Sequence, residues 1–182
     1  MNISIVIGSW GSYNECNKRA LGSKWLDLSD YYEWEEIVEE LEKEGFELDG
    51  VDEELFVQDI QGICDNSVNW DYVNPRELYE TLDESGVLSD DDRDELFNAY
   101  IEAKGFDSFK NLVEKYGNFW DDCLTLYGSQ NFQEMAVTYI EDFYPDIPDF
   151  IKDFIDYESL GDYLYEYDSY YETSEGVLFV DC

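Results

Sequence analysis

The chain has 182 residues and carries 46 Asp and Glu against 10 Lys and Arg, a formal net charge of −36. Hydrophobic residues make up 44% and aromatic residues 18%, which is too apolar for a disordered acidic tail. The chain has no histidine, so Ser-His and Cys-His nucleophile pairs are excluded and the commonest transition-metal ligand is missing. We therefore expect a folded protein that withstands strong self-repulsion because its function requires a negative surface.

The four cysteines are scattered without a Cys-x-x-Cys pair, which predicts free thiols. No apolar run approaches the ~20 residues of a membrane span, and the N-terminus lacks the basic region of a signal peptide. An anionic membrane surface would also repel the chain. We expect a cytoplasmic protein that does not bind membranes.

The first third predicts three strands and one helix. Residues 3–7 alternate as a strand does, and 24–28 and 55–60 are further strand candidates. Between the last two, helical spacing relates the apolar residues Trp34, Ile37, Val38 and Leu41. We expect a capping box from Asp30 and Glu33 at the start of this helix and a glycine cap, Gly45, at its end. The opposite face carries a row of four carboxylates, Glu33, Glu36, Glu40 and Glu44.

The middle predicts two helices. Asn74 before Pro75 is typical of a helix start, and Leu78 and Leu82 follow on one face. Ser89 is expected to cap a second helix that ends at Gly105. The inner face of that helix is apolar: Leu96, Phe97, Tyr100 and Ile101.

Carboxylates in the first turn of that second helix, Asp90, Asp91 and Asp92, complement the helix dipole. With Asp94 they also resemble the start of a calcium loop. However, Glu95 stands where that loop needs glycine and Ile101 where it needs a bidentate glutamate. We expect no metal and no cofactor.

The last third predicts short helices separated by Gly117 and Gly128, then a longer helix capped by Ser129. Its expected inner face is Phe132, Met135, Ala136, Tyr139, Ile140 and Phe143. Pro145 and Pro148 interrupt the pattern before a helix at 157–165 and strands at 170–173 and 176–180.

This order of elements predicts an α+β fold, an elongated chain of three small domains. Mixed antiparallel sheet plus helices is expected at each end, with a helical middle. The predicted boundaries are 1–61 for an N-terminal α+β domain, 62–104 for a central helical domain and 105–182 for a C-terminal α+β domain.

The charge has the magnitude of a stretch of duplex DNA, which carries one negative charge per ~1.7 Å of axis. Thirty-six charges at that density correspond to a rod of roughly 60 Å, or about 18 base pairs, whereas a compact globule of this length would be only about 40 Å across. Carboxylates at i, i+3 and i+4 of a helix lie about 5–6 Å apart, close to the phosphate spacing along a strand. The pattern favours an acidic protein that stands in for DNA.

Other functions are compatible with the same composition. An acidic binding module for a basic, nucleic-acid-binding protein is the chief alternative, and a hydrolase with a carboxylate pair is the third. Solvated helix faces and adaptation to high salt also produce many Asp and Glu. Nucleic acid is not an expected partner because phosphate repels the chain.

Several blocks of sequence resemble the ArdA family of antirestriction proteins. These blocks are Ile-Gly-Ser-Trp-Gly-Ser-Tyr-Asn-Glu (7–15), Leu-Gly-Ser-Lys-Trp-Leu-Asp-Leu (21–28), Glu-Leu-Phe-Val-Gln-Asp-Ile (54–60), Ile-Pro (147–148), Phe-Ile-Asp-Tyr-Glu (154–158), Asp-Tyr-Leu (162–164) and Gly-Val-Leu-Phe (176–179). Two departures are clear: Cys16 stands where the family usually has glycine, and Gln58 where it usually has histidine.

The resemblance implies an elongated three-domain homodimer that mimics B-form DNA and is not an enzyme. Such proteins are carried by mobile genetic elements such as plasmids and conjugative transposons, and occupy the DNA-binding groove of Type I restriction-modification enzymes, in their methyltransferase core. Two copies carry 72 net charges, equivalent to roughly 120 Å of duplex. The carboxylates expected to stand in for phosphates are Glu33, Glu36, Glu40, Glu44, Asp90, Asp91, Asp94, Asp153, Asp156, Glu158 and Asp162.

Overall fold

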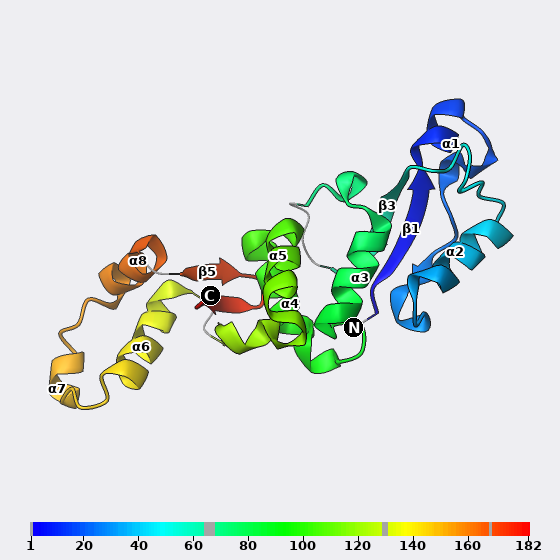
Figure 1. The fold of residues 1–182 in the computed structure, drawn as a ribbon. Helices are drawn as coiled ribbons and strands as arrows, with labels where there is room; N and C mark the ends of the chain where they lie inside the picture. The colour runs from blue at the N-terminus through cyan, green and yellow to red at the C-terminus, as the bar shows by residue number, and fades with distance from the viewer. Residues whose placement is uncertain (1, 64–67, 129–130, 168) are drawn as a thin grey trace.

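The computed structural model describes residues 2–63, 68–128, 131–167 and 169–182. Over these residues the fold mixes eight α-helices with two three-stranded antiparallel sheets, which confirms the prediction of mixed α and β structure. The elements are arranged along one long direction (Figure 1), with the N-terminal sheet at one end, helices α6 to α8 at the other, and the C-terminal strands between these helices and α4 and α5. No helix in the described parts of the chain is both long and apolar enough to cross a membrane.

The first sheet has the order β2-β1-β3. Strand β1 (Ser4–Ser9) lies between β2 (Leu26–Asp27) and β3 (Leu55–Gln61), and both pairings are antiparallel. Ile5 and Ile7 of β1 are fully buried, as the alternating pattern predicts. Helix α2 (Trp34–Lys43) places Trp34, Ile37 and Leu41 in the same core. All three predicted strands and the helix are therefore confirmed, with β2 shorter than expected.

Helix α1 (Trp10–Glu15), followed by the 3₁₀ helix Lys18–Leu21, connects β1 to β2. It ends at Cys16, whose φ of 51° lies in the left-handed region. This is the position at which the family usually has glycine, and a left-handed backbone is where glycine costs least.

The predicted capping box at the start of α2 is wrong. Residues Leu28–Asp30 form a short 3₁₀ helix instead, and Glu33 occupies the cap position without a side-chain cap bond. The N–H of Tyr32, which precedes the cap residue, donates to the Glu36 carboxylate at 2.7 Å, so a first-turn glutamate fixes the segment that leads into the helix. The C-terminal prediction is confirmed, since Gly45 follows α2 with φ of 91°.

The two helices predicted for the middle are confirmed as α3 (Pro75–Ser85) and α4 (Asp94–Lys104), preceded by the 3₁₀ helices Trp70–Tyr72 and Asp91–Arg93. The short helices expected on either side of Gly117 are α5 (Phe106–Tyr116) and the 3₁₀ helix Gly117–Cys123. The Asn74 side chain accepts from the N–H groups of Arg76 and Glu77, so this cap is confirmed.

The cap expected at Ser89 is one residue off. The Asp90 carboxylate accepts from the Asp92 N–H, whereas the Ser89 hydroxyl donates back to the Gly86 carbonyl. Ser and Asp are both good N-cap residues, so the sequence alone does not decide which of two adjacent ones caps the helix.

The second sheet has the order β4-β6-β5. Strands β5 (Tyr170–Thr173) and β6 (Gly176–Val180) have the predicted bounds. Strand β4 (Leu124–Tyr127) lies where only short helices were expected, and it pairs with β6 from Leu124 opposite Val180 to Tyr127 opposite Val177. Four residues after a 3₁₀ helix carry too little periodicity to show a strand that a distant partner stabilises.

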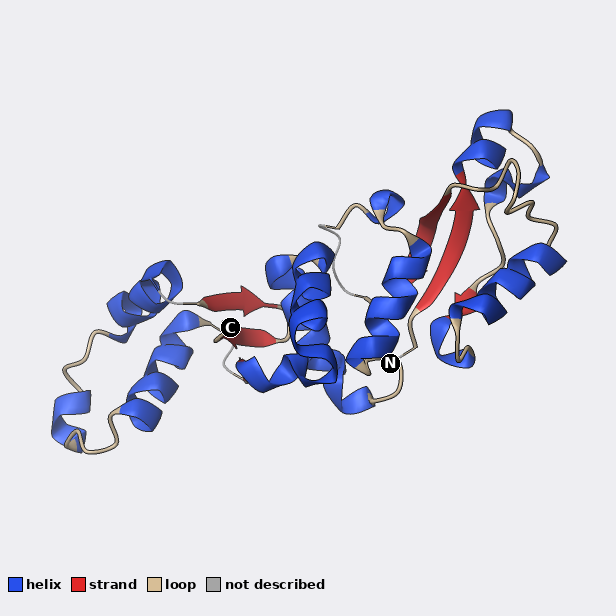
Figure 2. Ribbon diagram, in the orientation of Figure 1, coloured by secondary structure: helices blue, strands red, loops and turns tan. Residues whose placement is uncertain are grey.

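Between β4 and β5 the chain forms α6 (Phe132–Phe143), α7 (Asp149–Lys152) and α8 (Tyr157–Tyr167), which lie beyond the second sheet (Figure 2). We refer to residues 131–167 as the tip. The cap of α6 is Asn131, which accepts from the Glu134 N–H, and the expected cap Ser129 lies outside the described residues. Phe143 was expected to face inward but is 57% exposed, and its ring contacts Tyr139 on its own helix.

The buried side chains fall into two clusters of unequal size. The large cluster extends from Ile3 in the first sheet through the middle helices to Leu178 in the second sheet. The small cluster consists of Met135, Ala136, Leu164, Tyr170 and Val177. Helices α6 and α8 of the tip are therefore attached to the sheet through few buried residues.

Candidate functional surface

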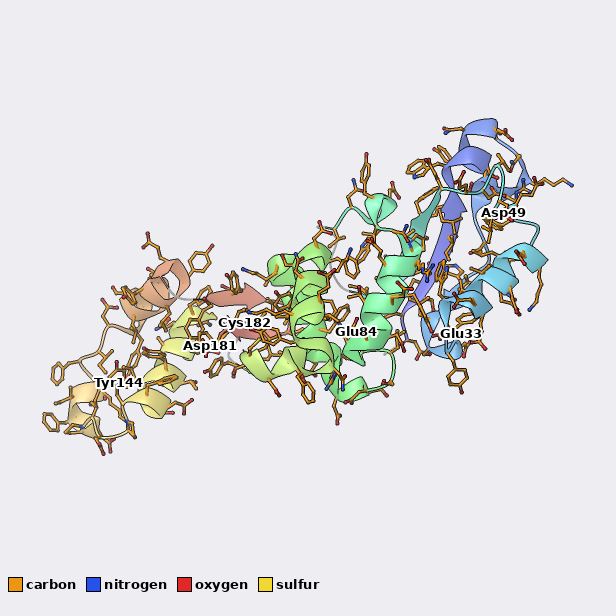
Figure 3. All side chains as sticks on the ribbon, in the orientation of Figure 1. Glu33, Asp49, Glu84, Tyr144, Asp181 and Cys182 are labelled. Atoms are coloured by element: carbon orange, nitrogen blue, oxygen red, sulfur yellow. The ribbon has the colours of Figure 1, made fainter. Side chains whose placement is uncertain are left out.

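Side chains of Asp and Glu occur along the whole length of the molecule. Figure 3 places Asp49 and Glu33 near one end, Glu84 midway and Asp181 toward the other end. The basic residues are distributed differently: nine of the ten precede residue 116, and residues 116–182 carry 16 Asp and Glu against a single base, Lys152. The negative surface is therefore least compensated in the C-terminal part.

The predicted acidic row on α2 is partly neutralised from within the molecule. The Lys24 ammonium lies 2.7 Å from one carboxylate oxygen of Glu40 and 3.8 Å from Glu44. Lys43 lies 2.8 Å from the other oxygen of Glu40. The hydrogen bond from Lys24 has the largest effect on Glu40 and the bond from Lys43 the next largest. Together they lower the pKa of Glu40 to about 2. Glu33 is exposed and Glu36 is half-buried.

Three further carboxylates of α2, which the predicted row leaves out, are also exposed: Glu35, Glu39 and Glu42. The helical wheel places Glu39 nearly opposite the buried stripe of Trp34, Ile37 and Leu41, whereas the predicted row flanks that stripe. A count of angles around the helix could have found them from the sequence.

The aspartates before α4 have different roles. Asp90 caps the 3₁₀ helix and lies 3.6 Å from the Arg93 guanidinium. Asp91 is exposed and Asp94 is half-buried at the start of α4. The helix-cap interpretation of this run is thus confirmed for Asp90.

The four carboxylates predicted near the C-terminus, Asp153, Asp156, Glu158 and Asp162, are all exposed. Asp156 accepts from the N–H and the hydroxyl of Ser159 at 3.0 and 2.8 Å, and these bonds lower its pKa. Within the described residues, Lys152 pairs with Asp149 rather than with any of these four. The tip therefore presents bare negative charge.

Several bases of the first two thirds are held in ion pairs inside the protein. Arg19 donates through Nε to the fully buried Asp52 at 2.9 Å, and Asp52 also accepts from the Ser12 hydroxyl and the Glu47 N–H. Burial acts to raise the pKa of Asp52, but these donors outweigh burial and lower it. Arg93 pairs with Asp121 at 3.4 Å and donates to the Ser85 carbonyl. Positive charge is thus used to hold loops and helices together.

The described residues contain no group of three His, Cys, Asp or Glu side chains that could hold a metal ion. Cys16, Cys123 and Cys182 are free thiols. Burial first, and the neighbouring Cys182 second, raise the pKa of Cys123 to about 12, so this thiol stays protonated at neutral pH.

The tip also exposes large apolar side chains. Phe143, Tyr144, Phe150 and Phe154 are all at least half exposed, and Phe154 reaches 86%. Several exposed aromatic side chains within one small segment indicate an interaction site more strongly than single ones scattered over a surface. The sequence did not predict this feature, because the spacing in α6 placed Phe143 in a core and no element was expected at α7.

The amino-acid sequence matches the family described as antirestriction protein (ArdA) over residues 5–179. The match covers nearly the whole chain and includes both sheets and all the helices described above. A comparison with curated proteins gives no match.

Proposed function

The chain belongs to the ArdA antirestriction family, and from this we propose that it inhibits Type I restriction-modification enzymes by occupying their DNA-binding groove as a mimic of B-form DNA. The target in this proposal is the methyltransferase core, which must bind DNA before either modification or cleavage. The protein acts in the cytoplasm by binding alone, with no catalytic step.

The observation that carries the proposal is the placement of the charge. A net charge of −36 is spread over every part of a chain whose elements follow one long direction. A groove built to bind duplex DNA presents Lys and Arg at phosphate spacing, and these can pair with surface carboxylates instead. The exposed carboxylates of the tip and the outer face of α2 support this role best.

The binding energy is distributed over many weak contacts in this mechanism. We propose that the predicted carboxylates contribute together with the outer row Glu35, Glu39 and Glu42. Each exposed ion pair is worth only about 0–1 kcal/mol, so single Glu→Gln changes are expected to be nearly silent. Because counterions are released on binding, the affinity should fall steeply as salt is raised.

We also propose a homodimer with three domains per chain, divided near residues 61 and 104. The exposed aromatic side chains of the tip supply apolar surface for pairing two copies. Two chains of charge −36 repel each other, so salt should strengthen this pairing while it weakens binding to the target. The change Phe154→Asp should leave a monomer in sedimentation equilibrium, whereas Tyr32→Asp, at a side chain 91% exposed near α2, should not.

The test of the function is cleavage of unmodified DNA by a purified Type I restriction enzyme during titration with this protein at two salt concentrations. We expect inhibition at near-stoichiometric protein, relief by excess DNA and weaker inhibition at high salt. A combined variant of Glu35, Glu39 and Glu42 to Gln should inhibit less well than the wild type, while Glu39→Gln alone should match it.

The alternative is an acidic module that binds a basic protein other than a restriction enzyme. Binding by such a module need not displace DNA from its partner. Inhibition that excess DNA leaves unchanged, or no inhibition of several Type I enzymes, would favour this alternative and overturn the proposal.

A further inference from the structure

A groove of about 520 Å³ lies where the tip meets the middle helices and the second sheet. Three aromatic rings and two carboxylates line it: Phe132 of α6, Tyr165 of α8, Tyr171 and Glu172 of β5, and Glu102 of α4, with Ala103 between them. Four separate elements therefore contribute to one concave site, which none of the predicted phosphate-mimicking residues lines.

Tight packing of two helices holds the first pair of rings. Gly161 of α8 lies so close to α6 that a Cβ there would come within 2.7 Å of the Phe132 carbonyl oxygen. One turn further along α8, the Tyr165 ring lies 4.9 Å from the Phe132 ring, centroid to centroid. The Tyr165 ring packs against Phe132 on one side, and because Tyr165 is 61% exposed, the rest of the ring is accessible to a ligand.

The Glu102 carboxylate is also held in place. It accepts from the N–H and the hydroxyl of Ser174, at 2.8 and 2.7 Å, in the turn between β5 and β6. Glu172 is exposed one residue beyond Tyr171. The groove therefore carries two negative charges beside three rings, that of Glu102 fixed by Ser174, which disfavours an anionic ligand and favours a cationic one.

One ring of the groove already contacts a cation of the protein itself. The Lys104 ammonium lies 4.6 Å from the centroid of the Tyr171 ring and donates to the Tyr171 hydroxyl at 2.9 Å. Lys104 does not line the groove, so Tyr171 is oriented by this contact while the groove remains open.

We propose that this groove binds the guanidinium side chain of an arginine presented by a protein partner. A guanidinium is planar, stacks on aromatic faces and donates to carboxylates in a fork, so it matches rings and carboxylates in one site better than a compact ammonium does. The inference deepens the proposed function, because a DNA-binding groove carries arginines that contact phosphate. It adds a specific anchor to the distributed charge.

The experiment titrates N-acetyl-arginine amide, N-acetyl-lysine amide and N-acetyl-citrulline amide separately into the full-length protein and follows NMR chemical shifts. We expect arginine amide to shift resonances of the groove saturably, lysine amide to bind roughly threefold or more weakly, and neutral citrulline amide not to bind. The variants Tyr165→Leu and Glu172→Gln should each weaken arginine binding roughly three- to fivefold.

Two matched variants separate a built site from general attraction to a negative protein. Tyr163→Leu and Glu166→Gln change exposed side chains of the same helix that do not line the groove, and both should bind arginine amide as the wild type does. Equal binding of lysine and arginine amides, equal losses in the control variants, or shifts spread over the whole surface would overturn the proposal. These readouts involve no restriction enzyme, so they fail or succeed independently of the inhibition assay.

Discussion

The surroundings of α2 and the tip use acidic residues in opposite ways. Around α2, Lys24 and Lys43 reach Glu40, and Arg19 reaches the buried Asp52, so carboxylates there take part in holding the fold. In the tip the only base is Lys152, and among the described residues the cluster that joins the tip to the second sheet has five buried members. Strong self-repulsion and a small core coincide at one end of the molecule, whereas ion pairs and a large core coincide at the other.

This difference indicates how a chain of such charge remains folded. The large cluster bears most of the stability, and internal ion pairs offset repulsion where loops must be fixed. The tip can then carry bare charge and exposed aromatic side chains, since local opening there need not unfold the rest. Substitutions in the large cluster and in the tip should therefore have different effects on unfolding.

The largest expected effect comes from the centre of the large cluster. Trp120 is fully buried, donates to the Ser85 carbonyl at 2.9 Å and packs edge-on against Phe109. Trp120→Ala should lower the free energy of unfolding by about 3–5 kcal/mol, measured by urea denaturation.

Leu164→Ala in the small cluster should instead speed hydrogen exchange throughout α6 and α8 and leave exchange in α3 to α5 unchanged. Equal acceleration in both regions would show that the molecule unfolds as one unit.

A somewhat smaller loss is expected at the buried ion pair. Arg19→Met removes the guanidinium from Asp52, which then stays buried with fewer donors, and breaking such a pair costs about 3 kcal/mol. Because the pKa of Asp52 is lowered in the folded protein, its contribution is present above the unfolded-state pKa and disappears as the pH falls through the folded-state value. The loss in Arg19→Met should therefore shrink in acid. Arg76→Met, at an exposed pair with Glu80 on α3, is the control and should cost less than 1 kcal/mol. A loss in Arg19→Met no larger than in this control would contradict a structural role for the pair.

The smallest effect concerns a single carboxylate. Lys24→Met removes the hydrogen-bond donor that lowers the pKa of Glu40 most, so this pKa should rise from about 2 toward its ordinary value. The pair stabilises the fold above the unfolded-state pKa of Glu40, and this contribution is lost as the pH falls through about 2. Carbon-13 NMR of the Glu side-chain carboxyl groups measures the change directly. Lys152→Met, remote in the tip, should leave Glu40 unchanged, and an unmoved Glu40 in Lys24→Met would count against the pairing.

Elements with strong local signals could be predicted from the sequence. The bounds of β5 and β6 and the buried stripe of α2 agree with the structure because alternation and helical spacing are local properties. Strand β4 could not be predicted because its pairing with β6 joins residues 50 to 56 positions apart. Caps were missed where two good cap residues are neighbours, as at Ser89 and Asp90.

The candidate surface was predictable only in part for a related reason. The acidity of α2 is visible in the sequence, but the approach of Lys24 to Glu40 and Glu44 depends on how β2 packs beside the helix. The groove lined by Tyr165 and Glu102 brings together residues from four elements, and no local sequence pattern links these residues. Charge could be read from the sequence, and its compensation could not.

The tip leaves the second sheet after β4 and returns at β5, and both strands pair with β6. Helices α6 and α8 therefore form an excursion whose length the sheet does not determine. Inserting seven residues into each helix would extend the molecule by about 10 Å, which equals about three steps of duplex DNA. The length of the molecule can thus change at this end without any change to the sheet or to the large buried cluster.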